Sequence, residues 1–316
     1  MNINEAIEEY LAAKRQEGRT TATIRQYRWH LARLALAMAR QNVIELAQLT
    51  KTLLRHWGAD LLDTYAPATT KVAVTATRSW LTWCRREGYM TADLTGALRY
   101  PKVPMRLQRT VSGAEITCLL KACDLSTPLG VRDAAIVALL VDSGLRRREL
   151  VNLRMPALNL VQGWARVTRK GGDQGIVWFG AMTAQRLQEW LMVRPDVAGD
   201  GIDNVFVSVG GSLKGAGLTP EGIRGVLRRL GARAGVTHVS PHAFRRSFAT
   251  LRLENGDSTR TVQALGGWKK IDMVERYSQA LDLSRLARKN APIDVLDGKL
   301  REIERVDAEH KKTQHL

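Results

Sequence analysis

A break in helical character at residues 101–110 constrains the fold of this chain most. The segment carries two prolines, which forbid helix continuation, and three basic residues able to follow a nucleic-acid backbone. It divides the 316 residues into two parts of ordinary domain size. We therefore expect a first domain over residues 1–100, a basic linker over residues 101–110 and a second domain from residue 111.

Residues 1–100 have the periodicity of amphipathic helices. Apolar side chains recur three and four residues apart in stretches that begin near residues 3, 20, 50 and 69. Thr20 or Thr21 is suited to cap the second helix, and the third starts near Thr50. Short helices of this kind can form a compact bundle.

Basic side chains on this bundle and in the linker are candidates for binding the phosphates of DNA. A solvated helical surface is the alternative, and the overall charge favours phosphate binding. The candidates are Lys14, Arg15, Arg25, Arg28, Lys71, Arg78, Arg85, Lys102 and Arg106.

The charge balance indicates a polyanionic partner. Lys and Arg number 48 against 31 Asp and Glu, which gives a net charge of +17. Such a surface attracts phosphates regardless of base sequence, so it favours DNA or RNA. Anionic lipid, or no specific partner, is the alternative. The longest apolar run, residues 134–141, is far shorter than the roughly 20 residues that span a bilayer.

The cysteines and the start of the chain indicate a reducing compartment. The first residues lack the basic region and apolar core of a secretory signal. Cys84, Cys118 and Cys123 are odd in number and lack metal-ligand spacing. Their apolar neighbours predict buried thiols. We expect a cytoplasmic protein.

The second part of the chain mixes helices with a small β-sheet. Ser112 and Glu115 have the spacing of a capping box that opens a helix. Residues 163–170 and 174–180 read as a hairpin with glycines at its turn, and residues 204–209 as another short strand. Further helices are expected over residues 129–142 and 147–154, and from residues 219, 240 and 257.

Several polar residues have the types and positions of an anion-binding site. Arg146 follows a Gly-Leu turn at a helix start, with Glu149 three residues on, and His242 and Arg245 share one helix face near another helix start. Each has an ordinary structural alternative, such as a local ion pair or a capping histidine. The remaining candidates are Lys170 at the hairpin tip, Trp268, and Tyr277 nine residues later.

Taken in order, these residues resemble the motif of the tyrosine recombinase, or phage integrase, family. The fit rests on Gly144-Leu-Arg146, Ser240-Pro-His-x-x-Arg245 and Leu265-Gly-Gly-Trp268 through Tyr277. The resemblance implies a mainly α fold: a helical, SAM-like core-binding domain over residues 1–100 and an α+β catalytic domain over residues 111–290. Two departures are Trp268 in place of a commoner histidine, and the lack of a second basic residue after Lys170.

The resemblance also implies a mechanism. Tyr277 would attack a phosphodiester and become joined to the DNA 3′ phosphate, while Arg146 and Arg245 hold the nonbridging oxygens. Lys170 would protonate the leaving 5′ oxygen, and His242 would assist proton movement. Trp268 would pack against the site or bond a phosphate oxygen, and Glu149 would orient its neighbours. Neither a metal nor a cofactor is expected.

The family assembles as a tetramer on two double-stranded DNA sites during integration, excision or resolution, and is encoded by bacteria, phages and mobile elements. The resemblance therefore implies the same here. An apolar stripe at positions 293, 296, 300 and 303 gives residues 291–316 the pattern of a C-terminal helix that docks on a neighbouring protomer. The alternatives are a type IB topoisomerase that only relaxes DNA, a non-catalytic DNA-binding protein on the same scaffold, and an RNA-binding helical protein.

Overall fold

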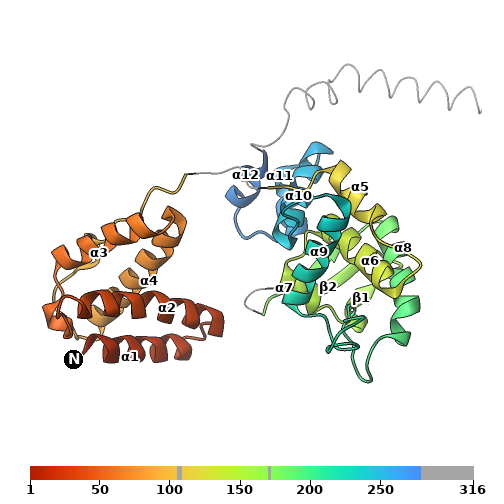
Figure 1. The fold of residues 1–316 in the computed structure, drawn as a ribbon. Coiled ribbons are helices and arrows are strands. Elements are labelled where there is room, and N and C mark those ends of the chain that lie inside the picture. The colour runs from red at the N-terminus through yellow and green to blue at the C-terminus, as the bar shows by residue number, and fades with distance from the viewer. Residues whose placement is uncertain (105–108, 170–171, 279–316) are drawn as a thin grey trace, which may run out of the picture. The chain divides into compact units, whose positions relative to one another are not determined.

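The computed structural model describes residues 1–104, 109–169 and 172–278 (Figure 1). It separates the chain into two compact units, Met1–Arg106 and Leu107–Leu316. The division falls inside the segment where the prolines interrupt the helical pattern. In the described part of the chain, no helix is both long and apolar enough to cross a membrane.

The first unit is built of helices, as the sequence predicts. Asn2 and Glu5 cap its first helix reciprocally, and Thr20 and Thr50 each accept a backbone N–H at the start of the next two. The last helix begins at a proline, where the missing N–H costs nothing. The helices are α1 (Ile3–Gln16), α2 (Thr21–Ala39), α3 (Lys51–Thr64) and α4 (Pro67–Arg86), with short 3-10 turns at Leu46–Gln48 and Thr95–Ala97.

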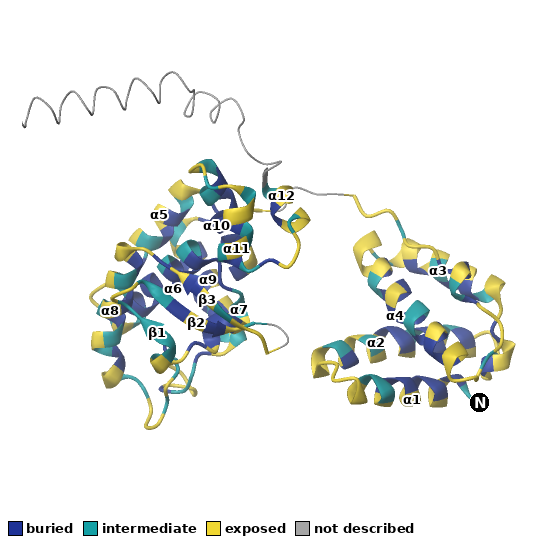
Figure 2. Ribbon diagram, turned by 180° about the vertical axis from the view of Figure 1, so that it is seen from behind, coloured by how far each residue is buried: buried dark blue, intermediate teal, exposed yellow. Residues whose placement is uncertain are grey.

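Aromatic side chains fill the core of this unit. The Tyr10 ring on α1 stacks on Tyr27 of α2 at 5.9 Å between centroids and meets Trp83 of α4 edge-on at 5.6 Å. Its buried hydroxyl donates to the Ser79 Oγ at 2.8 Å, and burial raises the pKa of Tyr10. Figure 2 shows the result as buried faces turned inward and exposed faces turned outward on each helix.

The second unit surrounds one long buried helix, α6. This helix is buried on nearly every side and packs against α5, α8 and α10. Its buried charges are compensated, because Asp133 accepts from Arg132 and from Arg229 at 2.6 Å each. The helices are α5 (Gly113–Lys121), α6 (Pro128–Ser143), α7 (Arg147–Val151), α8 (Ala181–Val193), α9 (Pro220–Ala234), α10 (Pro241–Glu254), α11 (Thr259–Gly266) and α12 (Asp272–Ser278), with 3-10 turns at Met155–Ala157 and Arg194–Asp196.

The sheet of this unit is antiparallel, in the order β1 (Leu158–Asn159), β2 (Trp164–Thr168) and β3 (Gln174–Trp178). The predicted hairpin is confirmed, with Arg166 opposite Ile176. The predicted strand at residues 204–209 is wrong: this stretch makes only isolated bridges, to Arg154 and to Gly217. One reason is that two of its carbonyls accept side-chain donors in place of a partner strand, since Trp190 donates to the Val205 carbonyl and Arg132 to the Val207 carbonyl.

Burial of the cysteines follows the prediction only in part. Cys84 and Cys123 are buried, and burial raises the pKa of both thiols to about 12 and about 11. Cys118 is exposed, so the expectation for it is wrong. Cys118 lies on a short amphipathic helix whose buried positions are Ile116 and Leu119, which leaves it on the outer face.

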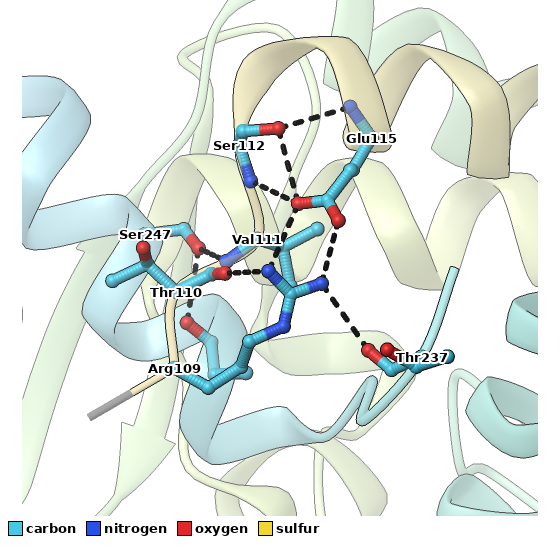
Figure 3. Close-up of polar contacts among 8 residues, drawn as sticks. Arg109, Thr110, Val111, Ser112, Glu115, Thr237 and Ser247 are labelled. Atoms are coloured by element: carbon cyan, nitrogen blue, oxygen red, sulfur yellow. Dashed lines mark hydrogen bonds and ion pairs between the residues drawn. The ribbon is translucent and has the colours of Figure 1, made fainter. Parts of the chain in front are cut away.

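A polar network fastens the start of the second unit to helix α10 (Figure 3). The Val111 N–H donates to the Ser247 Oγ at 2.7 Å. The Arg109 guanidinium donates to the Glu115 carboxylate at 2.6 Å and to the Thr237 carbonyl at 3.2 Å. Arg109 and the capping contacts of Ser112 lower the pKa of Glu115 to about 2. Helix α10, which carries His242 and Arg245, is therefore held from its buried side.

Candidate active site

Helix α10 presents two of the predicted residues in its first turns. Ser240 accepts the N–H of Ala243 at 3.2 Å, and Pro241 occupies the first helical position, so the helix starts where the sequence predicts. His242 is exposed, whereas Arg245 is buried with 6% of its surface accessible. The same helix start thus offers an accessible imidazole and a buried guanidinium.

The Arg245 guanidinium joins two loops that are far apart in sequence. Its Nη1 donates to the Gly144 carbonyl and its Nη2 to the Gly266 carbonyl, each at 2.6 Å. Its Cζ lies 4.0 Å from the centre of the Trp268 ring. Burial, followed by the nearby charge of Arg146, lowers the pKa of Arg245 to about 10, so the group remains charged at neutral pH.

Gly144 ends α6 in the left-handed conformation, with φ of 58°. A Cβ atom at this position would stand 2.7 Å from a ring carbon of Phe248, so the turn requires glycine for both its backbone and its packing. The turn sends Leu145 into the core and leaves Arg146 partly accessible at the start of α7.

Glu149 holds Arg146. Its Oε2 accepts the Arg146 backbone N–H at 2.8 Å, and its Oε1 accepts from the Arg146 Nη1 at 2.7 Å. The carboxylate is buried, whereas about a third of the Arg146 side chain is accessible, at 35%. A buried acceptor therefore fixes an accessible guanidinium.

Trp268 and Tyr277 meet beside Arg245. Trp268 is buried and packs on Phe248 at 6.2 Å and on Tyr277 at 6.0 Å between ring centroids. Tyr277 is half-buried on α12, which packs against α10. Its phenol is close enough to Arg245 to influence the charge of that guanidinium. Arg146, Arg245, Trp268 and Tyr277 therefore share one neighbourhood.

His242 lies in positive surroundings. Partial desolvation of the ring, then the charges of Arg246, Arg245, Arg147 and Arg146, lower the pKa of His242 below its ordinary value. The imidazole is consequently neutral at neutral pH and able to accept a proton.

Lys170 lies outside the described residues. The structure describes its neighbours in the hairpin, Arg169 and Gly172, and an ion pair of 3.4 Å between Asp173 and Lys269 that joins the hairpin to the loop carrying Trp268. Arg169, which is not among the residues expected from the sequence, lies against Gly267 of this loop. Its position directly before Lys170 is the signal that could have drawn attention to it.

The DNA-binding candidates of the first unit differ in what they already contact. Lys14 pairs with Glu17, Arg28 with Glu8 and Arg85 with Asp93. Arg78 donates to the carbonyls of Thr95 and Leu98 at 2.9 and 2.7 Å, so it supports the turn after α4. Arg15, Arg25, Lys71 and Lys102 are exposed, and Arg106 lies outside the described residues.

Comparison with known proteins places the chain in a family. The model of the "Phage integrase family" matches residues 109–283. The chain is 30% identical over 276 residues to the tyrosine recombinase XerD of Staphylococcus haemolyticus, covering 86% of this chain and 92% of the relative. It is 32% identical over 286 residues to XerC of Xanthomonas campestris, covering 90% and 86%.

Solved structures show the same fold. A XerH recombinase bound to a palindromic difH substrate matches with a TM-score of 0.71, 18% identity and coverage of 91% of this chain and 84% of that one. A lambda integrase fragment bound to a core site matches with a TM-score of 0.68 and 18% identity, covering 86% and 97%. With the family model and the sequence relatives, this chain belongs to the phage integrase family and is a tyrosine recombinase.

Proposed function

We propose that this protein is a site-specific DNA recombinase in which Tyr277 is the nucleophile. The observation that carries the assignment is the position of the Arg245 guanidinium, which is held by two loop carbonyls and stacked on Trp268, beside the Tyr277 phenol. A fixed cation next to a hydroxyl nucleophile is the arrangement that phosphoryl transfer requires. The named tyrosine recombinases XerD and XerC are relatives over most of this chain.

The reaction exchanges one phosphodiester for another. The Tyr277 oxygen attacks the phosphorus and forms a phosphotyrosyl bond to the DNA 3′ end, while the bond to the 5′ oxygen breaks. The phenol loses one proton and the leaving 5′ oxygen gains one, so no water, nucleotide or redox partner is consumed. Attack by the 5′ hydroxyl of another strand reverses the step and joins the strands in a new combination.

Arg146 and Arg245 would bind the nonbridging oxygens, where negative charge grows in the transition state. Arg245 has five N–H donors, two of which bond the Gly144 and Gly266 carbonyls, and its remaining N–H groups would bond the phosphate. Arg146 is accessible on one side and fixed by Glu149 on the other. Their guanidinium groups can bond an oxyanion bidentately.

The proton transfers are assigned to Lys170 and His242. Lys170 follows Arg169 in the sequence and would protonate the leaving 5′ oxygen. His242 is neutral because its surroundings lower its pKa, and it would accept the Tyr277 proton or bond the phosphate. The Trp268 ring would support Arg245 and Tyr277, and its indole N–H is a further donor for a phosphate oxygen.

DNA binding is assigned to both units. The exposed basic residues of the helical unit would hold backbone phosphates, with 101–110 acting as a linker. We propose assembly as a tetramer on two sites in the cytoplasm, in integration, excision or resolution, with residues 291–316 docking on a neighbouring protomer. A lambda integrase tetramer bound to a Holliday junction, solved with the same fold at a TM-score of 0.66, supports this assembly.

The experiment begins by letting the protein select its own site from fragmented genomic DNA of its source. A duplex of that site, nicked so that the cleaved strand diffuses away, should trap the wild type as a denaturant-resistant adduct. Tyr277→Phe should bind this duplex but form no adduct. Tyr65→Phe is the matched control, because the centre of the Tyr65 ring also lies 4.0 Å from an arginine Cζ, that of Arg33. This variant should form the adduct normally.

Two outcomes would overturn the proposal. One is a Tyr277→Phe protein that forms the adduct at the wild-type rate. The other is a wild type that relaxes a plasmid without the selected site as fast as a plasmid with it, because such activity belongs to a topoisomerase.

A further inference from the structure

Two glycines from different elements leave room for the side chain of Arg169. Gly175 is the second residue of β3, and Gly267 directly follows α11 with φ of 61°. A Cβ atom at Gly175 would stand 2.7 Å from the Arg169 Cζ, and one at Gly267 would stand 2.5 Å from its Nη2. The guanidinium therefore fills the space that both glycines leave open.

This space adjoins the site described above. Arg245 donates to the carbonyl of Gly266, and the Arg169 guanidinium lies against the next residue, Gly267. Trp268, which stacks on Arg245 and packs on Tyr277, follows directly in the chain. The positive charge of Arg169 is near enough to Arg245 to disfavour its charged form. Two guanidinium groups thus lie against consecutive residues, Gly266 and Gly267.

The cluster has little negative charge of its own. Glu149 is engaged by Arg146, and Asp173 pairs with Lys269. Within the described ranges, no carboxylate forms an ion pair with Arg169. Neighbouring like charges repel each other, and a phosphate placed between them would relieve that repulsion.

We propose that Arg169 binds the scissile phosphate as a third arginine of the site, a role that rests on the function proposed above. Packing of the hairpin on the α11–α12 loop is the structural alternative. An apolar side chain would serve that purpose without a half-buried charge, and the Asp173–Lys269 ion pair already joins the same two segments. Packing alone therefore does not explain why this side chain is charged.

The first test separates charge from packing in the full-length protein. Arg169→Met keeps the length and apolar stem of the side chain and removes its charge. Losing one donor to a developing oxyanion lowers the rate by about 10²–10³, and we expect about 10- to 100-fold here because Arg169 is half-buried. The thermal midpoint should stay unchanged, because methionine keeps the packing. A packing role alone would leave the cleavage rate unchanged as well.

The second test asks which phosphate Arg169 contacts. A methylphosphonate at the scissile position removes the charge of that phosphate alone. If Arg169 neutralises it, the difference between wild type and Arg169→Met should shrink to a few-fold on this substrate. An equal penalty on both substrates would overturn binding of the scissile phosphate.

The third test moves the arginine. The Cβ atom of an arginine at position 175 would lie where the Arg169 guanidinium now lies. The extended backbone of β3 accepts any residue there. Gly175→Arg alone should be inactive through crowding. The double variant Arg169→Gly/Gly175→Arg should recover at least tenfold over Arg169→Gly. Failure of this rescue in a folded protein would count against a role for the charge.

Failure of this proposal can be told apart from failure of the function proposed above. If Arg169→Met cleaves within twofold of wild type while Tyr277→Phe is inactive, only the role of Arg169 is lost. If Tyr277→Phe still forms the adduct, the proposed function itself fails.

Discussion

Arg245→Lys tests whether the fork of the guanidinium, rather than its charge alone, builds the site. Arg245 reaches the Gly144 and Gly266 carbonyls with separate nitrogens, and its Cζ lies over the Trp268 ring. A lysine keeps the charge but presents it from one nitrogen, without a planar group to stack. It cannot hold both carbonyls and still offer a paired donor to a phosphate.

The magnitude follows from these contacts. A hydrogen bond from a charged group contributes about 1.5–3 kcal/mol, so losing one carbonyl bond should lower the free energy of unfolding by about that amount. In the transition state, a lost oxyanion donor costs about 2.7–4 kcal/mol, or 10²–10³ in rate. Cleavage should therefore fall at least 100-fold while most of the protein remains folded.

The assay is single-turnover cleavage of the nicked duplex, with the thermal midpoint and DNA affinity measured on the same samples. Arg252→Lys is the matched control, because Arg252 lies on the same helix, 5.6 Å from the Phe248 ring, and pairs with Asp257. It should cleave normally. Arg245→Lys with a rate within threefold of wild type would refute the reasoning.

Three further predictions follow from other contacts. The acid limb of the pH–rate profile for cleavage should be centred below the ordinary histidine pKa of about 6.5, because the surroundings of His242 lower its pKa. His242→Gln should lack this limb, and a limb centred above pH 7 would contradict the assignment. Gly144→Ala should lower stability by at least about 1–2 kcal/mol, from its positive φ and its overlap with Phe248, measured by denaturant unfolding; an unchanged midpoint would be inconsistent with that overlap. Lys71→Ala should reduce the salt slope of DNA binding by about one at constant thermal midpoint, whereas Arg78→Ala should lower the midpoint; the reverse pattern would exchange their roles.

Local chemistry made much of the fold predictable. The helix starts at Thr20, Thr50, Ser112 and Ser240 depend on side chains that accept the backbone N–H three residues further on. The hairpin depends on alternation and on the glycines at its turn. Residues 204–209 do not form the expected strand because the Val205 and Val207 carbonyls accept from Trp190 and Arg132, contacts that the local sequence pattern does not show.

The site was predictable in composition but not in geometry. The order of Arg146, His242, Arg245 and Tyr277 indicated the family, yet spacing could not show that one guanidinium bonds the carbonyls of Gly144 and Gly266. Arg169 was missed for the same reason. Its neighbour Gly267 lies about a hundred residues away, and only packing places the two together.

The most direct test of the account is to identify the residue joined to DNA. The trapped wild-type adduct would be digested with protease and nuclease, and the remaining nucleotide-bearing peptide sequenced by mass spectrometry. We predict a peptide containing Tyr277, linked through its phenolic oxygen to a 3′ phosphate, with a free 5′ hydroxyl on the released strand. A link to any other residue, or to a 5′ phosphate, would contradict it.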